Sequence, residues 1–445
     1  MASEPPPPRP VPRPRFFVAL LLVACGAALF ASAFRVGVEA VFERVFHAPN
    51  VLAAFERLPL WARVAIPAVG GLLAGLASER ARRLQGGQGV GDVMEAVALG
   101  GREVSLPATA WKAAGSFGAI VSGGSIGREG PIILFGGALG SRLGAALRIS
   151  AIRTRALIAA GTAAGFAAAY NTPFAAVLFV VEVVTGVVAL GIVLPTLIAA
   201  AIATAITRFV VGPGPIYGQH AFAMRSDGEL LIHLLLGVAA GLVGVAFVRM
   251  LGAGERAFAR LPVARPLRPA IGGAIVGVIA CALPTVTGNG YEAIALILAG
   301  KVGVALLAIL VIAKAIATTS SVGSGSPGGV FTPSLFLGAA LGAMVASALA
   351  RFWPALPVGP AGGYALVGMA AVVAATTHAP LMSAVLVFEL SGDYAIVLPL
   401  LVATSAATAV ARELMPSSIY MQELERKGVR WKVTLDGRVV ERNEE

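Results

Sequence analysis

The feature of this sequence that most restricts its fold is a series of long stretches without a charged residue. About 20 consecutive apolar residues are needed to cross the hydrocarbon core of a bilayer. Only 13% of the residues are charged, whereas soluble domains carry about 25%. The composition therefore predicts an all-α polytopic membrane protein that partners the lipid bilayer. The uncharged stretches are Phe16–Phe34, Ala156–Val181, Val183–Thr207, Pro269–Tyr291, Ala315–Ala350, Phe352–Phe388 and Tyr394–Ala411.

Much of the net charge of +11 lies in short basic segments near these stretches, such as Arg9–Arg15 and Ser78–Arg83. Short basic flanks of membrane spans usually remain in the cytoplasm, so we expect both termini there. Residues 1–15 contain a proline run and are expected to form an extended cytoplasmic tail. A nucleic-acid partner is not expected, because no basic stripe with interleaved aromatic residues occurs.

The chain aligns with itself in three ordered places. The segment "PIILFGGALG" from Pro131 matches "PSLFLGAALG" from Pro333 at five of ten positions, and "NTPFAAVLFVVE" from Asn171 matches "HAPLMSAVLVFE" from His378. Lys112 precedes Glu129 by the same 17 residues that separate Lys314 from Phe331. Ordered matches of this kind indicate a duplicated membrane unit. We place repeat 1 at residues 16–208, a linker at 209–227, repeat 2 at 228–411, and a last helix with a short tail at 412–445.

Three glycine-rich breaks interrupt the apolar stretches, and each precedes an apolar helix. They are Gln85–Val93, Gly123–Pro131 and Gly323–Pro333. Transporters built from inverted repeats often bind their substrate at the midplane, on helices that stop partway across the membrane. A helix N-terminus has unpaired N–H groups and a partial positive charge, and it therefore attracts anions. The breaks are expected to converge on one dehydrated anion, and no metal site or cofactor is indicated.

The segments "GREGP", "GSGSPGGVFTP", "NTPFAAVLFVVEVV", "VLVFELSGDY" and "PSSIY" resemble, in this order, the signature segments of the CLC chloride channel and transporter family. The resemblance covers about residues 16–425. It implies the CLC fold, with two inverted-topology repeats of tilted and half-membrane helices, in a prokaryotic member without CBS domains. It also implies the inner membrane, chloride or a similar anion as partner, and a homodimer with one pore per subunit.

The resemblance assigns Glu129 as the gating glutamate, whose ionised carboxylate takes an anion position and moves away when protonated or displaced. A structural Glu129 paired with Arg128 is the alternative. Lys112 and Lys314 either raise the positive potential of the path or extend toward the membrane surface. The anion-binding positions implied by the resemblance are Gln88, Gly89, Arg128, Glu129, Gly130, Val330, Phe331, Thr332 and Tyr420.

Two positions depart from the family pattern. Gln88 stands where the family commonly has an anion-coordinating serine, which leaves the preferred anion open between chloride, fluoride and nitrate. Val183 stands where proton-coupled members carry a second glutamate, and valine cannot titrate. The sequence therefore favours a channel-like or weakly proton-coupled protein, with proton-coupled antiport as the alternative. Glu182 is expected to be structural, because Glu389 holds the same place in the other repeat.

Other classes fit less well. The run Gly323–Gly328 satisfies the GxGxxG pattern, which indicates dinucleotide binding only inside a βαβ unit. Here it lies inside the uncharged stretch Ala315–Ala350, so an enzyme is not expected. A cation antiporter would place paired acidic residues at the broken helices, whereas this chain offers the single Glu129 among N–H donors.

Overall fold

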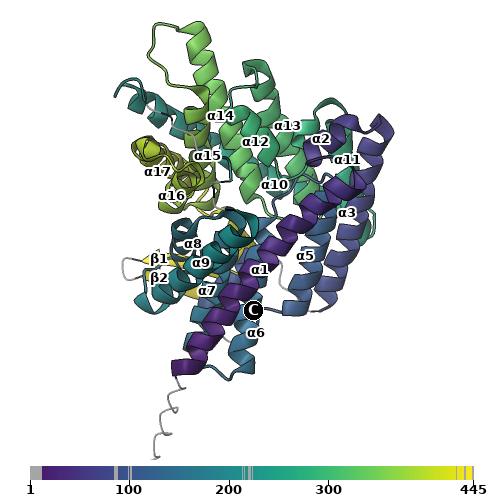
Figure 1. The fold of residues 1–445 in the computed structure, drawn as a ribbon, viewed down its shortest axis with the longest axis vertical. Helices are drawn as coiled ribbons and strands as arrows, with labels where there is room; N and C mark the ends of the chain where they lie inside the picture. Colours follow the sequence, from purple (N-terminus) through teal and green to yellow (C-terminus); the bar gives the residue numbers. More distant parts are fainter. Residues whose placement is uncertain are drawn as a thin grey trace, which may run out of the picture.

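The computed structural model describes residues 13–84, 89–98, 100, 103–212, 214, 216–218, 222, 224–426, 428–434 and 437–442. Helices dominate this part of the chain, and one antiparallel hairpin follows the last helix (Figure 1). The elements are α1 (Arg13–Val45), α2 (Val51–Arg57), α3 (Leu60–Arg83), α4 (Val90–Ala98), α5 (Leu106–Val121), α6 (Glu129–Ala146), α7 (Ala151–Tyr170), α8 (Pro173–Phe179), η1 (Val180–Thr185), α9 (Leu190–Val211), α10 (Glu229–Arg260), η2 (Arg265–Leu267), α11 (Arg268–Ala282), η3 (Pro284–Val286), α12 (Tyr291–Leu298), α13 (Val304–Gly323), α14 (Phe331–Phe352), α15 (Ala361–Thr377), α16 (Pro380–Ser391), η4 (Tyr394–Ile396), α17 (Val397–Leu414), α18 (Ile419–Glu425), β1 (Val429–Thr434) and β2 (Gly437–Arg442).

The prediction of an all-α membrane fold is confirmed. The structure differs from the prediction within the segments expected to be a tail, a linker and a last helix with its tail. Helix α1 already begins at Arg13, so residues 13–15 are helical rather than part of the expected tail, whose other residues lie outside the described ranges. Helix α9 likewise continues to Val211 and enters the segment expected to be a linker. The β1–β2 hairpin lies in the segment where we expected only a helix and a tail.

Within the described residues, eight helical segments are long and apolar enough to cross a membrane. Other helices are too short. Helix α4 has nine residues, which at 1.5 Å per residue is about 14 Å, or half the thickness of the hydrocarbon core. Helix α1 crosses the molecule obliquely (Figure 1). Tilted and half-membrane helices were expected from the sequence, and they leave helix ends inside the protein.

Glycines allow close crossings between neighbouring helices. A Cβ on Gly136 of α6 would collide with the carbonyl of Gly161 on α7, and a Cβ on Gly338 of α14 would collide with the carbonyl of Gly368 on α15. Small residues let helix backbones approach closely in membranes, where packing rather than water drives association. The two crossings involve corresponding helices of the two proposed repeats.

Glu182 and Glu389 tie the two proposed repeats together by reciprocal bonds. Each carboxylate accepts two backbone N–H groups from the first turn of a helix in the other half. The two glutamates are 207 residues apart, and each donor to Glu182 is likewise 207 residues from the corresponding donor to Glu389. Carboxylates at helix N-termini satisfy unpaired donors and oppose the positive end of the helix dipole. The structural role expected for Glu182 therefore has a contact to support it. The donors are Leu381 and Met382 for Glu182 (3.3 and 2.7 Å), and Phe174 and Ala175 for Glu389 (3.1 and 2.8 Å).

Removing either carboxylate is expected to lower stability. Glu182→Ala and Glu389→Ala each lose two charge-assisted hydrogen bonds, and we expect a cost of about 2 kcal/mol for each. Thermal unfolding in detergent measures the change, with Glu413→Ala at an exposed position of α17 as the control. Melting temperatures equal to that of the control would show that the reciprocal bonds contribute nothing.

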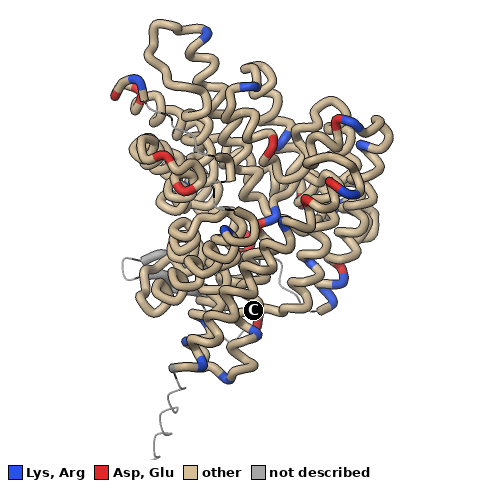
Figure 2. The backbone as a smooth tube through the Cα atoms, viewed as in Figure 1, with Lys and Arg blue, Asp and Glu red and all other residues tan. Residues whose placement is uncertain are grey.

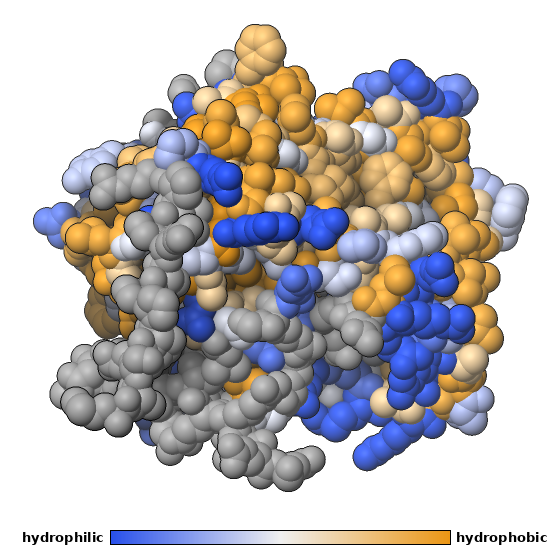
Figure 3. Space-filling model, turned by 90° about the horizontal axis from the view of Figure 1, so that it is seen from below, coloured by the Kyte–Doolittle hydropathy of each residue, from blue (hydrophilic) through white to orange (hydrophobic). Residues whose placement is uncertain are grey.

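Several Lys and Arg residues lie at the lower end of the molecule in Figure 2, and others lie at its upper and right-hand edges. Figure 3 looks onto this end and shows hydrophilic residues on the face and hydrophobic residues at its edge. Four arginines, Arg82, Arg265, Arg268 and Arg426, line a hollow of about 430 Å³ together with the Gly323–Gly328 break. We call it the basic hollow, because its arginines outnumber its two acidic residues, Glu79 and Glu255.

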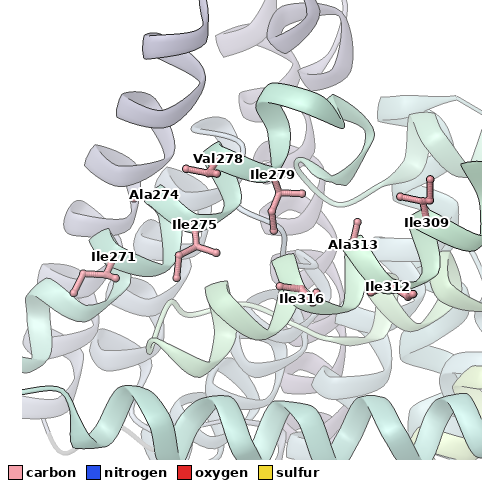
Figure 4. A pocket seen from close by; sticks show the side chains of 9 residues that line it. All are labelled: Ile271, Ala274, Ile275, Val278, Ile279, Ile309, Ile312, Ala313 and Ile316. Carbon is pink, nitrogen blue, oxygen red and sulfur yellow. The ribbon is translucent and has the colours of Figure 1, made fainter.

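A second hollow, of about 570 Å³, lies between α11 and α13 (Figure 4). Aliphatic side chains line it, and an aliphatic lining offers an ion no hydrogen bond in exchange for its hydration shell. This apolar groove therefore offers no binding site for an ion. Its lining residues are Ile271, Ala274, Ile275, Val278, Ile279, Ile309, Ile312, Ala313 and Ile316.

Candidate anion site

The break before α6 and the break before α14 lie against each other. Gly127 and Gly329 exchange both backbone hydrogen bonds, at 2.7 and 2.8 Å. Because α6 begins at Glu129 and α14 begins at Phe331, this short bridge holds the N-termini of the two helices together. The convergence expected for these two breaks is therefore present in the structure.

Glu129 lies in the first turn of α6 but bonds to the N-terminus of α14. One carboxylate oxygen accepts the backbone N–H of Phe331 at 3.0 Å and of Thr332 at 3.1 Å, and the other accepts the Thr332 hydroxyl at 2.9 Å. The residue is 1% exposed. Hydrogen bonds to a charged acceptor are stronger than neutral ones, and the dipole of α14 adds to them. The carboxylate thus occupies a position with the hydrogen-bonding character of an anion site.

Glycine is required on both sides of this carboxylate. A Cβ on Gly127 or on Gly329 would overlap the carboxylate group of Glu129. The close approach of backbone to the acidic group explains why both breaks need a residue without a side chain.

A cavity of about 210 Å³ lies beside the carboxylate and brings together most of the predicted binding positions. Tyr420, on α18, lines it and is 8% exposed, with its ring edge-on to Phe179 at 6.0 Å between centroids. Phe331 and Thr332 instead contribute the amides that hold Glu129. The predicted positions that line the cavity are Gly89, Glu129, Gly130, Val330 and Tyr420.

The side chain of Arg128 points elsewhere. Its guanidinium lies over the ring of Tyr291, 4.8 Å from the centroid, and lines a separate hollow of about 280 Å³ that also contains Glu292. Glu129 bonds to α14, so the observed contacts do not support the alternative in which Glu129 serves to pair with Arg128. A cation near an anion path raises its positive potential without binding the ion directly.

The third break is seen only in part, because Gln88 lies outside the described residues. The N–H of Gly89 donates to Asp92 at 2.8 Å, which is a bond within the start of α4. Anion binding by Gly89 therefore requires this bond to be exchanged, and its role stays a prediction.

Val183 and the two lysines lie in different surroundings. Val183 is 3% exposed and forms part of η1. Lys314 is fully buried and donates to the carbonyls of Val286 and Gly288 at 2.9 and 3.0 Å, so it does not extend to the membrane surface. Lys112 lines both the 210 Å³ cavity and the basic hollow, and its effect on an anion path stays a prediction.

Sequence reasoning missed two residues of the site. The hydroxyl of Tyr170 is 2.9 Å from the Thr332 hydroxyl, which in turn donates to Glu129. The second residue is Glu423 of α18, which lines the cavity together with Tyr420. A buried tyrosine next to the "NTP" segment was a signal for the first, whereas no motif marks Glu423.

Comparisons with known proteins agree with this geometry. A family model described as Voltage gated chloride channel matches residues 70–412. A putative chloride channel protein ClcB-like of Ralstonia nicotianae is 38% identical over 91% of this chain and 95% of its own length. The voltage-gated ClC-type chloride channel ClcB of Salmonella typhimurium is 34% identical over 90% of this chain and 97% of its own length.

Two solved structures are similar to this chain along almost their whole length. A slow cyanobacterial Cl⁻/H⁺ antiporter has a TM-score of 0.84 at 26% identity, covering 94% of this chain and 99% of that one. A CLC-type fluoride/proton antiporter has a TM-score of 0.75 at 23% identity, covering 91% and 95%. Fold and comparisons define an integral membrane protein of the anion-transporting class. The chain belongs to the voltage-gated chloride channel family, the CLC family, and has its fold.

Proposed function

We propose that this protein conducts chloride through a path that Glu129 gates. The observation that carries the proposal is the position of the Glu129 carboxylate on the amides of Phe331 and Thr332. Those donors suit an inorganic anion equally well, since a helix N-terminus needs no fixed cation to bind one. The carboxylate acts as an anion attached to the protein, and it closes the path while it occupies the site.

Opening follows from competition for the same donors. Protonation removes the negative charge of Glu129, and a neutral carboxyl group holds the two amides less strongly than an ionised one. A chloride ion that arrives through the cavity then takes over the amides of Phe331 and Thr332. The side chain has room to move, because it borders the cavity of about 210 Å³ that Tyr420 also lines.

Channel-like or weakly coupled conduction is the form we favour, because Val183 places a group that cannot titrate at the position of the second glutamate. Curated relatives carry the name chloride channel, which agrees. Proton-coupled chloride antiport is the second candidate, and the likeness to the cyanobacterial Cl⁻/H⁺ antiporter at 26% identity favours it. Fluoride or nitrate as the transported anion is a third possibility that selectivity measurements decide.

Efflux from proteoliposomes tests the proposed function. Vesicles loaded with potassium chloride and containing the purified protein are expected to release chloride when valinomycin lets internal potassium leave with it, and protein-free vesicles are not. Replacing internal chloride by fluoride, nitrate or gluconate in parallel gives the anion preference. Release no faster than from protein-free vesicles for every anion would refute the proposal.

The proposal includes an arrangement in the membrane. We infer two repeats at residues 16–208 and 228–411, both termini in the cytoplasm, and the inner membrane of a prokaryote as the location. The arginine-lined end supports the orientation, and the bacterial sources of the curated relatives support the location. A homodimer is part of the proposal, and large exposed apolar side chains on α9 and α17, including Leu194 and Leu398, offer a surface for it.

A further inference from the structure

A second carboxylate shares the cavity with Glu129. Helix α18 begins at Ile419 after its N-cap Ser418, and it carries Tyr420 and Glu423 three residues apart. Residues three apart lie on the same face of a helix, and both of these line the cavity of about 210 Å³. Glu423 is partly buried, while Glu425 on the same helix is exposed.

The Glu423 carboxylate lies at the N-terminus of α4. One oxygen accepts the backbone N–H of Gly91 at 3.3 Å. A Cβ on Gly89 would overlap this carboxylate, and a Cβ on Gly91 would lie in tight contact with it. This contact therefore places an acidic side chain at the N-terminus of α4. The contact of Glu129 does the same at the N-terminus of α14.

The charges around the cavity make this carboxylate significant for an anion. Five charged side chains line it, and of these Glu255 forms an ion pair with Arg426. Lys112, Glu129 and Glu423 also line it, and each of these three has interaction partners of its own. An anion that enters this cavity comes near the negative charge of Glu423 as well as that of Glu129, and repulsion between like charges lowers its occupancy.

We propose that Glu423 is an inner gate residue, whose carboxylate competes with the entering anion for the N-terminus of α4. This inference rests on the proposed function, since it needs an anion path through the cavity. Two carboxylates then close the path in series, Glu129 on α14 and Glu423 on α4. The competing interpretation is a structural contact that attaches α18 to α4 without any effect on the anion.

Chloride efflux in the Glu129→Ala background tests the proposal, because there the outer carboxylate no longer limits flux. Adding Glu423→Gln is expected to raise efflux at low chloride by about tenfold, from the loss of one like charge near the ion. Glu425→Gln in the same background is the control and is expected to leave efflux unchanged. Unchanged or reduced efflux with Glu423→Gln, together with a lower melting temperature, would show the structural interpretation to be correct.

Chloride binding provides a second measurement that does not need transport. Isothermal titration of the Glu423→Gln protein with chloride is expected to give about tenfold tighter binding than the Glu425→Gln control. Equal affinities would overturn the inner gate. If the Glu129→Ala protein conducts no anion, the proposed function fails, whereas conduction that is insensitive to Glu423 removes this inference alone.

Discussion

Proteoliposomes containing the Glu129→Ala protein are expected to release chloride about ten to a hundred times faster than those containing the native protein. In the native structure the carboxylate holds two amides and a hydroxyl of α14. Charge-assisted hydrogen bonds contribute about 1.5–3 kcal/mol each, and this energy opposes the binding of chloride at the same place. In the Glu129→Ala protein, the hydrogen-bond donors of Phe331 and Thr332 are always available to chloride.

Initial efflux rates at equal protein density measure this effect, and two variants serve as references. Glu129→Gln keeps the size of the side chain without its charge and is expected to lie between the native protein and Glu129→Ala. Glu413→Ala removes an exposed carboxylate of α17 and is expected to behave as the native protein. Native protein that conducts chloride while Glu129→Ala leaves the rate unchanged would end the assignment of Glu129 as the gate.

The sequence predicts much of the Glu129 site because the main features of this site are local. Glycine-rich breaks between apolar runs determine where helices begin, and a carboxylate in the first turn of α6 follows directly from the order of residues. The internal match at Pro131 and Pro333 pairs the two breaks. The bridge between Gly127 and Gly329 then requires only that the two breaks meet.

Contacts between segments far apart in the chain were beyond this reasoning. Glu423 lies 332 residues from Gly91, and its position depends on the direction in which α18 leaves the membrane. Lys314 had two expected roles, an effect on the anion path and extension to the surface, but its ammonium donates to the carbonyls of Val286 and Gly288. A fully buried lysine needs such acceptors, yet the sequence does not say which carbonyls supply them.

Proton coupling is the second property for which a large difference is expected. Proton paths through membrane proteins use chains of titratable side chains, and the resemblance implies that Val183 stands where proton-coupled members have a glutamate. Val183 is 3% exposed and packs among the apolar side chains of the core. A chloride gradient is therefore expected to move at least about tenfold fewer protons than chloride ions.

A pH electrode outside chloride-loaded vesicles, with valinomycin present, measures proton movement that the chloride gradient drives. The cyanobacterial Cl⁻/H⁺ antiporter that this fold resembles, reconstituted at the same density, supplies a coupled reference. Sustained proton movement against its own gradient by the native protein, at a fixed ratio to chloride, would contradict the expectation. Glu423→Gln and Glu182→Gln would then identify the carrier, because only the true relay residue abolishes proton movement while chloride continues to flow.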